Sequence, residues 1–387
     1  MAIAIQPFDS SRIEAIAAFN RRMAAAGSRW QFPERPEPSW FARAEGSPVF
    51  QEFFLAVDGE AVRGGYALQH RTASFRGAEH PIGAWYQPIS EGSVDPKHGL
   101  VAIQLLRDAL RRQPLCFGLG LEGLGSQLSK LMATLRCELR LIPFFVRIEN
   151  GGRFAREARY LRKRRALSPL LEVAAATGAA GLCAALVRRA LQRVPRPDAE
   201  VIEESAAGFG PWADEVWMRC RERYSFVAVR DAATLNRIYP ERQRFRCLRL
   251  VRGNTTLGWA VLDSKRMSDD SKFGDLHIGR IADCLAAPED ADAVVRAAAD
   301  ALVREGVDVM LSNQSHPAWC AALRRNAFLS APSNFVFAPS PELGKRIRAI
   351  DPDGRDVHLN RADDNGGPLT RAPFSARRSR RARAAAA

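Results

Sequence analysis

The sequence predicts an α/β (α+β) protein made of two tandem mixed sheets flanked by helices. The first observation is a repeated segment: residues 57–68 and 251–262 each have the pattern of a strand, a tight turn at a glycine and a returning strand. Glycine supplies the positive φ that a short hairpin turn needs. In both copies a second glycine, Gly64 or Gly258, follows five residues after the first. A spacing of about half the chain indicates two related domains rather than a short-period repeat.

The second observation is that both halves have the same order of elements. In the first half, the helix expected at 100–112 places Leu100, Ile103, Leu106 and Leu110 on one face. The expected elements of this half are a strand at 4–6, a helix at 11–26 with Ser10 as its N-cap, the hairpin at 52–75, a strand at 82–90, a loop at 91–96, the helix at 100–112, a strand at 116–121, a helix at 127–135 and a closing strand at 139–148.

The second half repeats this order, with Pro288 suited to the first turn of a helix. Its expected elements are a strand at 200–203, helices at 212–222 and 232–239, the hairpin at 246–264, a strand at 276–285, a helix at 288–304, a strand at 307–312, a helix at 317–326, a strand at 334–337 and a last strand at 356–361. A chain of 387 residues accommodates two domains, which we place at 1–150 and 199–365.

Two basic segments lie outside these domains. Residues 151–198 are basic, alanine-rich and expected to be helical, and they form the linker. Within them, residues 170–187 are apolar but rich in alanine and glycine, which favours a helix packed between domains over a membrane span. The tail at 366–387 carries six arginines from Arg371 to Arg383 and is expected to be disordered, with weak contact to nucleic acid or an anionic membrane as an alternative.

Composition narrows the functional classes. The net charge of +14 is concentrated in the tail and in residues 162–165, and no zinc-finger or RNA-recognition motif accompanies it, so nucleic-acid binding is not favoured. The seven cysteines form no CxxC pair and the six histidines form no HExxH motif, so no metal or redox site is expected. The first eight residues lack the pattern of a signal peptide, and we expect a cytoplasmic protein, with a peripheral membrane location as an alternative.

The order hairpin, strand, loop, amphipathic helix, strand, helix, strand resembles that of the GNAT acyltransferase superfamily, over about residues 1–150 and 199–340. Residues 230–239 and 358–365 of this sequence also resemble segments of uncharacterised bacterial tandem GNAT proteins. The resemblance implies that acyl-CoA lies between the fourth and fifth strands. It also implies that backbone N–H groups of the following loop bind the pyrophosphate, as at any helix N-terminus.

The loop of the first half is similar to the family motif V-x-P-x-x-[QR]-x-x-G-x-[GA]. Lys97 takes the Gln/Arg position and Ala102 the last small residue, whereas Leu100 replaces the expected glycine, for which Gly99 could compensate. Lys97 and His98 could supply positive charge to the phosphates. The residues that the resemblance assigns to acyl-CoA are Ser90, Val94, Lys97, His98, Gly99, Leu100, Val101 and Ala102.

The equivalent loop of the second half, residues 287–292, has no glycine and three carboxylates. Carboxylates suit a helix N-terminus but repel a pyrophosphate. The second half is therefore expected to have an altered cofactor loop and to shape the acceptor site, with Asp283 and Cys284 as candidate pocket residues. Cys284 falls at the position of Ser90 by the offset of the hairpins. The structural alternatives are that Asp283 is a carboxylate hydrogen-bonded at the end of a strand and that Cys284 is a thiol in the core.

Amine acylation needs a base for the acceptor and an acid for the thiolate leaving group. Glu91 follows the fourth strand, where superfamily members often place the base, and the alternative is a loop carboxylate that accepts N–H bonds. The helix at 127–135 lacks the usual tyrosine acid and has Met132 or Thr134 near that place, so water could supply the proton.

These features predict an acyl-CoA-dependent N-acyltransferase, such as an acetyltransferase using acetyl-CoA, that acts on a small-molecule or peptide amine. Two alternatives remain. A Fem-type aminoacyl transferase fits the basic charge, but no helical arm is evident. A catalytically degenerate pair serving as a binding or scaffold protein fits the missing glycine and the missing tyrosine.

Overall fold

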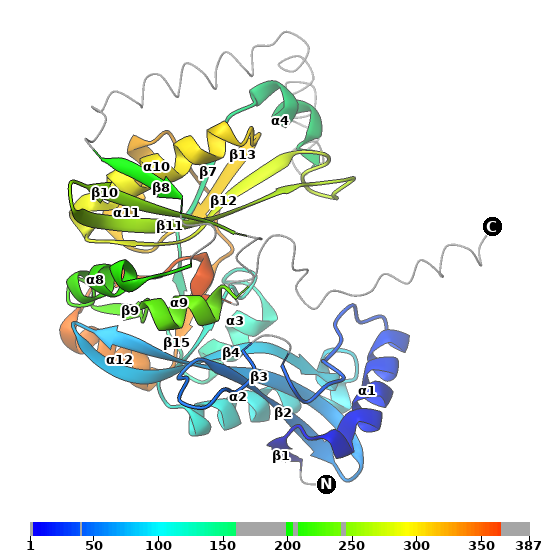
Figure 1. Ribbon diagram of the computed structural model, residues 1–387. Helices are drawn as coiled ribbons and strands as arrows, with labels where there is room; N and C mark the ends of the chain where they lie inside the picture. Colours follow the sequence, from blue (N-terminus) through cyan, green and yellow to red (C-terminus); the bar gives the residue numbers. More distant parts are fainter. Residues whose placement is uncertain (1–2, 39–40, 160–198, 204–207, 241–244, 365–387) are drawn as a thin grey trace.

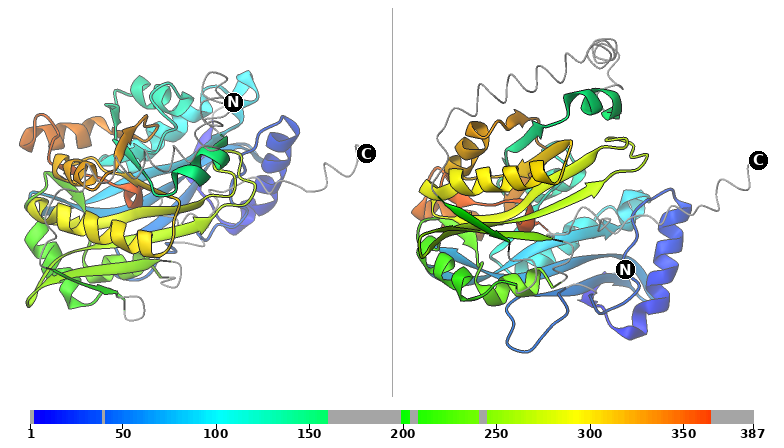
Figure 2. Two further views of the ribbon diagram at one scale, coloured as in Figure 1. Left: turned by 90° about the horizontal axis from the view of Figure 1, so that it is seen from above. Right: turned by 45° about the horizontal axis from the view of Figure 1, so that its top comes forward.

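The computed structural model describes residues 3–38, 41–159, 199–203, 208–240 and 245–364, which form two β-sheets with helices on their faces (Figure 1). In the right-hand view of Figure 2 the second sheet, green to yellow, is stacked on the first, blue to cyan. The first sheet runs in the order β1 (Ala4–Pro7), β2 (Phe50–Asp58), β3 (Ala61–Phe75), β4 (Ala78–Ser90), β5 (Cys116–Leu119), β15 (Val336–Pro339) and β6 (Arg140–Leu141).

Two short strands extend this sheet beside the end of β3, namely β9 (Phe226–Ala228) and β16 (Val357–His358). Both come from the second half of the chain, so the two halves share this sheet. The second sheet runs in the order β14 (Leu329–Ala331), β7 (Phe144–Ile148), β13 (Val309–Asn313), β12 (His277–Ala286), β11 (Thr255–Arg266), β10 (Arg246–Arg252) and β8 (Glu200–Glu203).

The two predicted hairpins are the same structure. Gly59 and Gly253 have nearly equal φ values of 59° and 57° and begin equivalent turns. The register shift between β2 and β3 falls at Ala56/Val57, and that between β10 and β11 falls at the equivalent Leu250/Val251. Matching turns and matching bulges confirm the duplication that the sequence predicts.

The second glycine of each hairpin allows a helix to pack closely. A Cβ on Gly64 would lie 2.6 Å from the Ile89 carbonyl oxygen and 3.0 Å from a methyl group of Val101. A Cβ on Gly258 would lie 2.6 Å from the Leu285 carbonyl oxygen and 3.0 Å from a methyl group of Val294. Each glycine therefore sits where its own strand, the next strand and the following helix meet.

Helices cover both faces of each sheet, as predicted. In the first half α1 (Ile13–Ala25) packs on one face, and α2 (Val101–Arg112) and α3 (Gln127–Thr134) pack on the other. In the second half α8 (Pro211–Cys220) and α9 (Ala232–Ile238) pack on one face, and α10 (Ala291–Arg304) and α11 (Pro317–Arg325) on the other. Figure 1 shows α8 and α9 between the two sheets.

Some local details differ from the sequence prediction. The N-terminal cap before α1 is Asp9 rather than Ser10, because the Asp9 carboxylate accepts the Ser11 N–H at 2.9 Å and opens a 3₁₀ turn at Ser10–Arg12. The helix α12 (Pro341–Ile350) was not expected, although Ser340 caps it and Pro341 occupies its first turn. The helix α4 (Gly151–Glu157) begins the segment expected to be helical.

The expectation that residues 139–148 close the first sheet is wrong. Only β6 belongs to the first sheet, and after Pro143 the chain crosses to the second sheet, where β7 pairs with β13 and β14. In return β15 leaves the second half and pairs with β5 and β6. The halves thus exchange strands, and each completes the sheet of the other.

Several predictions fall on residues outside this description: the linker at 160–198, with its apolar stretch at 170–187, and the tail at 366–387. Among the residues that are described, no helix is long and apolar enough to cross a membrane.

Candidate functional site

Each half contains a pair of parallel strands that pair over only three residues and then separate. β4 pairs with β5 from Gly83 to Trp85 and continues to Ser90, whereas β5 ends at Leu119. In the second half β12 pairs with β13 from Ile278 to Arg280 and continues to Ala286. The opening between two such strands exposes backbone groups that have no ladder partner, so it can accept an extended polar chain.

A bulge in β4 lies within this opening. Between the pairs Gly65–Ile89 and Ala67–Tyr86, β4 contains one extra residue. Gln87, next to Pro88, has a φ of 47°, which is rare for a residue other than glycine. The side-chain oxygen of Gln87 is buried and has no hydrogen-bond partner. Backbone strain and an unpaired polar atom at one position are typical of functional sites.

The sheet register corrects one sequence alignment. Gly64 pairs with Ser90, and the equivalent Gly258 pairs with Ala286. The structural counterpart of Ser90 is therefore Ala286 and not Cys284. The sequence offset of the hairpins does not hold beyond them, because the connection from β3 to β4 differs in length from that between β11 and β12.

The predicted phosphate loop consists of two 3₁₀ turns, η2 (Glu91–Ser93) and η3 (Pro96–His98), followed by α2. The Ser90 hydroxyl accepts the Gly92 N–H at 3.1 Å, and the Asp95 carboxylate accepts the Lys97 N–H at 3.0 Å. The Val94 N–H is also bonded within the loop, to the Glu91 carbonyl at 3.0 Å. The N–H groups of Asp95, His98 and Gly99 are also bonded within the loop, so most donors before residue 100 are used and the start of α2 is the better place for an anion.

The start of α2 has no side-chain cap. Leu100 has ordinary helical angles, with φ −79°, and its side chain is 71% exposed, so the glycine that the family motif has here is not needed for the backbone conformation. Val101 is buried and anchors the turn, while Ala102 is half-buried. The first-turn N–H groups of α2 therefore remain available to an anion beside exposed Lys97 and half-buried His98.

The two glycines of the loop differ in how much space surrounds them. A Cβ on Gly92 would lie 2.5 Å from the His98 carbonyl oxygen, so only glycine fits where the two 3₁₀ turns touch. Gly99 has a φ of −57° and more room, because its Cβ would lie 3.2 Å from the Pro96 oxygen. Gly92, which the motif comparison did not single out, is the position where another residue would distort the loop.

Glu91 is the acceptor of an ion-pair cluster. Its buried carboxylate receives the Arg22 Nε at 2.9 Å and the Arg63 Nη1 at 3.1 Å, which ties the loop to α1 and β3. Burial alone would raise the pKa of the Glu91 carboxyl, but the hydrogen bonds from Arg22 and Arg63 outweigh burial and lower it. A carboxylate with a lowered pKa is a weak base, so this geometry suits an anchor of the loop.

The opening in the second half is filled by the end of the described chain. The His358 ring nitrogen Nε2 lies 3.0 Å from the Cys284 carbonyl oxygen, and the Asn360 side-chain amide donates to Asp283 at 2.8 Å. Asn360 also forms a bridge with Gln314, just past the end of β13. Residues 358–360 therefore occupy the space next to β12 that, in the first half, lies beside the bulge of β4.

Asp283 and Cys284, the two predicted acceptor-pocket residues, are buried next to residues 358–360. The Asp283 carboxylate binds Arg230 at 2.9 Å and the Tyr239 hydroxyl at 3.0 Å, and Arg230 also binds Asp363 at 2.8 Å. The Cys284 side chain is fully buried, and burial raises the pKa of its thiol well above the usual range. A ligand would reach either side chain only if this network opened.

Two of the three carboxylates at the start of α10 already have cationic partners. Glu289 pairs with Arg223 at 2.9 Å, and Asp292 binds Arg325 at 2.9 Å. Negative side chains at this helix N-terminus take the place that an anionic ligand would need. The described part of the second half therefore offers neither an open strand pair nor a cationic loop.

Two tyrosines near the first opening were not considered from the sequence. The Tyr66 hydroxyl, opposite the bulge, donates to Asp108 at 2.8 Å, and burial together with that bond raises its pKa far above the usual range. Tyr86, which precedes the bulge on β4, is half-buried and lies within electrostatic range of Arg361. Tyr66 is fully buried, so of the two tyrosines only Tyr86 is accessible enough to donate a proton to a ligand.

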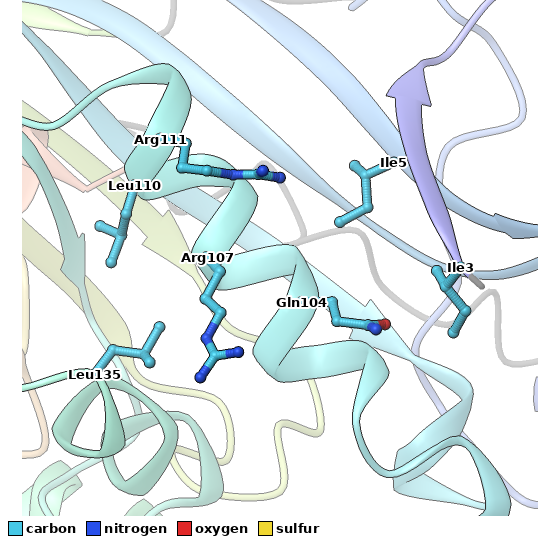
Figure 3. A pocket seen from close by; sticks show the side chains of 7 residues that line it. All are labelled: Ile3, Ile5, Gln104, Arg107, Leu110, Arg111 and Leu135. Carbon is cyan, nitrogen blue, oxygen red and sulfur yellow. The ribbon is translucent and has the colours of Figure 1, made fainter.

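A pocket of about 540 Å³ lies over the outer surface of α2 and is lined by Ile3, Ile5, Gln104, Arg107, Leu110, Arg111 and Leu135 (Figure 3). None of its lining residues belongs to β4 or to the loop at 91–100, so it is separate from the strand opening. Among the described residues, no group of three or more His, Cys, Asp or Glu side chains is arranged to hold a metal ion.

No family model and no curated protein matches the sequence. Solved structures do match the fold. A probable N-acyltransferase from Enterococcus faecalis V583, described as a conserved protein of unknown function, aligns with a TM-score of 0.52 at 9% identity, over 89% of this chain and 74% of that chain. A GCN5-related N-acetyltransferase from Anabaena variabilis aligns with a TM-score of 0.51 at 9% identity, over 87% of this chain and 72% of that chain. This chain therefore has the fold of the GNAT acyltransferases, built twice in tandem.

Proposed function

We propose that this protein is an acyl-CoA-dependent N-acyltransferase that uses only its first half to bind the acyl-CoA. The observation that carries the proposal is the contrast between the two strand openings. The β4–β5 opening is followed by an uncapped helix start beside Lys97, whereas the β12–β13 opening is filled by residues 358–360.

In the proposed complex, the pantetheine chain extends along β4 past the bulge, and the pyrophosphate lies at the N–H groups of Val101 and Ala102. Lys97 and His98 add positive charge, and exposed Leu100 lies at the edge of the site. A backbone N–H near the bulge binds the oxygen of the tetrahedral intermediate, because a preorganised donor stabilises the developing negative charge.

We further propose that a water molecule, rather than Glu91 itself, takes the proton of the acceptor amine. The two arginines bound to Glu91 keep it ionised and occupy its oxygens, so the cluster positions the loop. The nitrogen of the amine attacks the thioester carbonyl, the C–S bond breaks, and the CoA thiolate leaves. Tyr86 is the candidate donor of the proton that the thiolate receives.

Calorimetry with acetyl-CoA and longer acyl-CoAs tests the proposal. We expect one acyl-CoA per chain, and Lys97→Glu to weaken binding tenfold or more, because a charge-assisted phosphate contact contributes about 1–3 kcal/mol. The matched change Glu289→Lys in the second half should leave the affinity nearly unchanged, since that loop does not contact the cofactor.

Equal losses in both variants would indicate general electrostatics and not a site at α2. A second candidate function is a binding or scaffold protein without catalysis, and the ion-paired state of Glu91 favours it. Failure of wild-type protein to bind any acyl-CoA would support that candidate over the acyltransferase.

A further inference from the structure

The pocket over α2 has an apolar floor and a polar side. Ile5 lies on the edge strand β1 and Ile3 directly precedes it, Leu110 belongs to α2, and Leu135 follows the end of α3. Figure 3 shows Gln104 and Arg111 extending from α2 toward Ile3 and Ile5, whereas Arg107 extends toward Leu135. Apolar walls with a few polar groups on one side are typical of sites for small amphipathic molecules.

The polar side carries excess positive charge. Arg107 is exposed and has no carboxylate partner among the described residues. Arg111 binds Asp108 at 3.2 Å, but the same carboxylate also binds Arg112 at 2.7 Å and accepts the Tyr66 hydroxyl. One carboxylate therefore serves two arginines, and the pocket retains net positive charge that favours an anion.

Gln104 indicates a second property of the ligand, a hydrogen-bond donor. Its side-chain oxygen is buried and has no hydrogen-bond donor, although the residue lines the pocket. A buried acceptor without a partner is costly, and rotation of the Gln104 amide toward the pocket would let its oxygen accept an N–H or O–H group of a ligand. Gln104 and Arg107 are three residues apart on α2, so their side chains are neighbours on one face of the helix.

We infer that this pocket binds an N-acylated amino acid. The aliphatic chain would lie on Ile3 and Ile5, the carboxylate would pair with Arg111 and with Arg107 one helical turn away, and the amide N–H would donate to Gln104. A simple fatty acid lacks the N–H group, and an acylated amine lacks the carboxylate. The inference goes beyond the proposed function and does not require that this chain catalyse acyl transfer.

The test is calorimetric titration of the full-length chain, without CoA, with N-decanoylglycine, with its methyl ester and with decanoate. We expect N-decanoylglycine to bind at least tenfold more tightly than the ester or decanoate. Arg107→Gln should weaken its binding at least tenfold. Gln104→Leu should weaken N-decanoylglycine to the level of decanoate and leave decanoate unaffected.

Arg304→Gln is the matched control, because Arg304 is an exposed arginine on α10, the counterpart of α2 in the second half. It should leave every affinity unchanged, and melting temperatures should show that all variants fold. Equal binding of ester and acid, equal losses for Arg107→Gln and Arg304→Gln, or no binding by wild type would each overturn the inference. So would competition by CoA, which would place the ligand in the strand opening.

Discussion

The two strand openings derive from the same arrangement and differ in what lies beside them. In the first half β4 carries a strained bulge at Gln87 and leads through two 3₁₀ turns to a helix start beside Lys97. In the second half β12 is lined by His358 and Asn360, and acidic residues precede α10. The two halves therefore retain the same fold, whereas only the second has its strand opening filled by another segment of the described chain.

The largest expected effect concerns the independence of the two halves. A fragment of residues 1–150 lacks β15 between β5 and β6, so its sheet is incomplete and we expect no cooperative unfolding transition by circular dichroism. Co-expression of fragments 1–159 and 199–387 should restore one complex, because each fragment supplies the strand that the other needs. A fragment 1–150 that unfolds cooperatively by itself would show that the exchanged strands are dispensable.

The filled opening should depend strongly on its buried charges. Arg230→Gln leaves the carboxylates of Asp283 and Asp363 buried without their cation, and removal of one partner from a buried ion pair costs about 3–5 kcal/mol. Urea denaturation should show that loss. The matched change Arg63→Gln should cost much less, because it removes only one of the two cations bound to Glu91 and leaves Arg22 in place. Equal costs would mean that the two openings do not differ in packing.

Stability should also depend on pH through the filled opening. Burial first, and then the nearby Arg230 charge, lower the pKa of His358 from its ordinary 6.5 to about 3. Between these values the unfolded chain binds the proton and the folded chain does not, so stability falls as pH decreases from about 6.5 towards 3. Near pH 5 the loss is about 2 kcal/mol, at about 1.4 kcal/mol per pH unit.

The variant His358→Gln isolates this contribution. It removes the titrating ring, so the stability difference between the variant and wild type should change with pH over that window. Denaturation curves at several pH values measure it. A difference that stays constant from pH 7 to pH 4 would mean that His358 is accessible to protons in the folded state, and hence that the opening is not closed.

The smallest expected effect concerns the role of Glu91 beside the first opening. Glu91→Gln should change kcat less than threefold, because Glu91 anchors the loop and does not take a proton, whereas loss of a general base lowers rates by about 10²–10⁴. Steady-state kinetics would decide, once an acceptor is identified, with Tyr86→Phe as the comparison that should lower kcat more. A hundredfold loss for Glu91→Gln would restore Glu91 as the base.

Much of the fold could be predicted because its signals are local. The hairpin turns depend on Gly59 and Gly253, and the helix starts depend on Pro288 and Pro317. The predicted apolar face of α2 was only partly right, because Leu106 is buried but Leu100 is exposed, and the buried side is completed by Val101, Leu105 and Ala109. The helix α12 has equally local signals in Ser340 and Pro341. These features involve residues a few positions apart, so they can be read along the chain.

The candidate site was predictable only in outline. The element order places the loop at 91–102 after β4, and the acidic loop at 287–292 distinguishes the second half. The partners of Glu91 were not predictable, because Arg22 lies on α1 and Arg63 on β3. The closure of the second opening was not predictable either, because His358 and Asn360 come from a segment more than 70 residues beyond β12.

The sequence by itself therefore determined the duplication, the order of the elements and the charge of the two loops, since all three depend on residues close together in the chain. Only the tertiary structure decided that β7 and β15 exchange sheets and that one opening is filled while the other is not. The physical reason is that an apolar strand pattern specifies burial but not a pairing partner, and a buried charge reveals its role only through the group that compensates it.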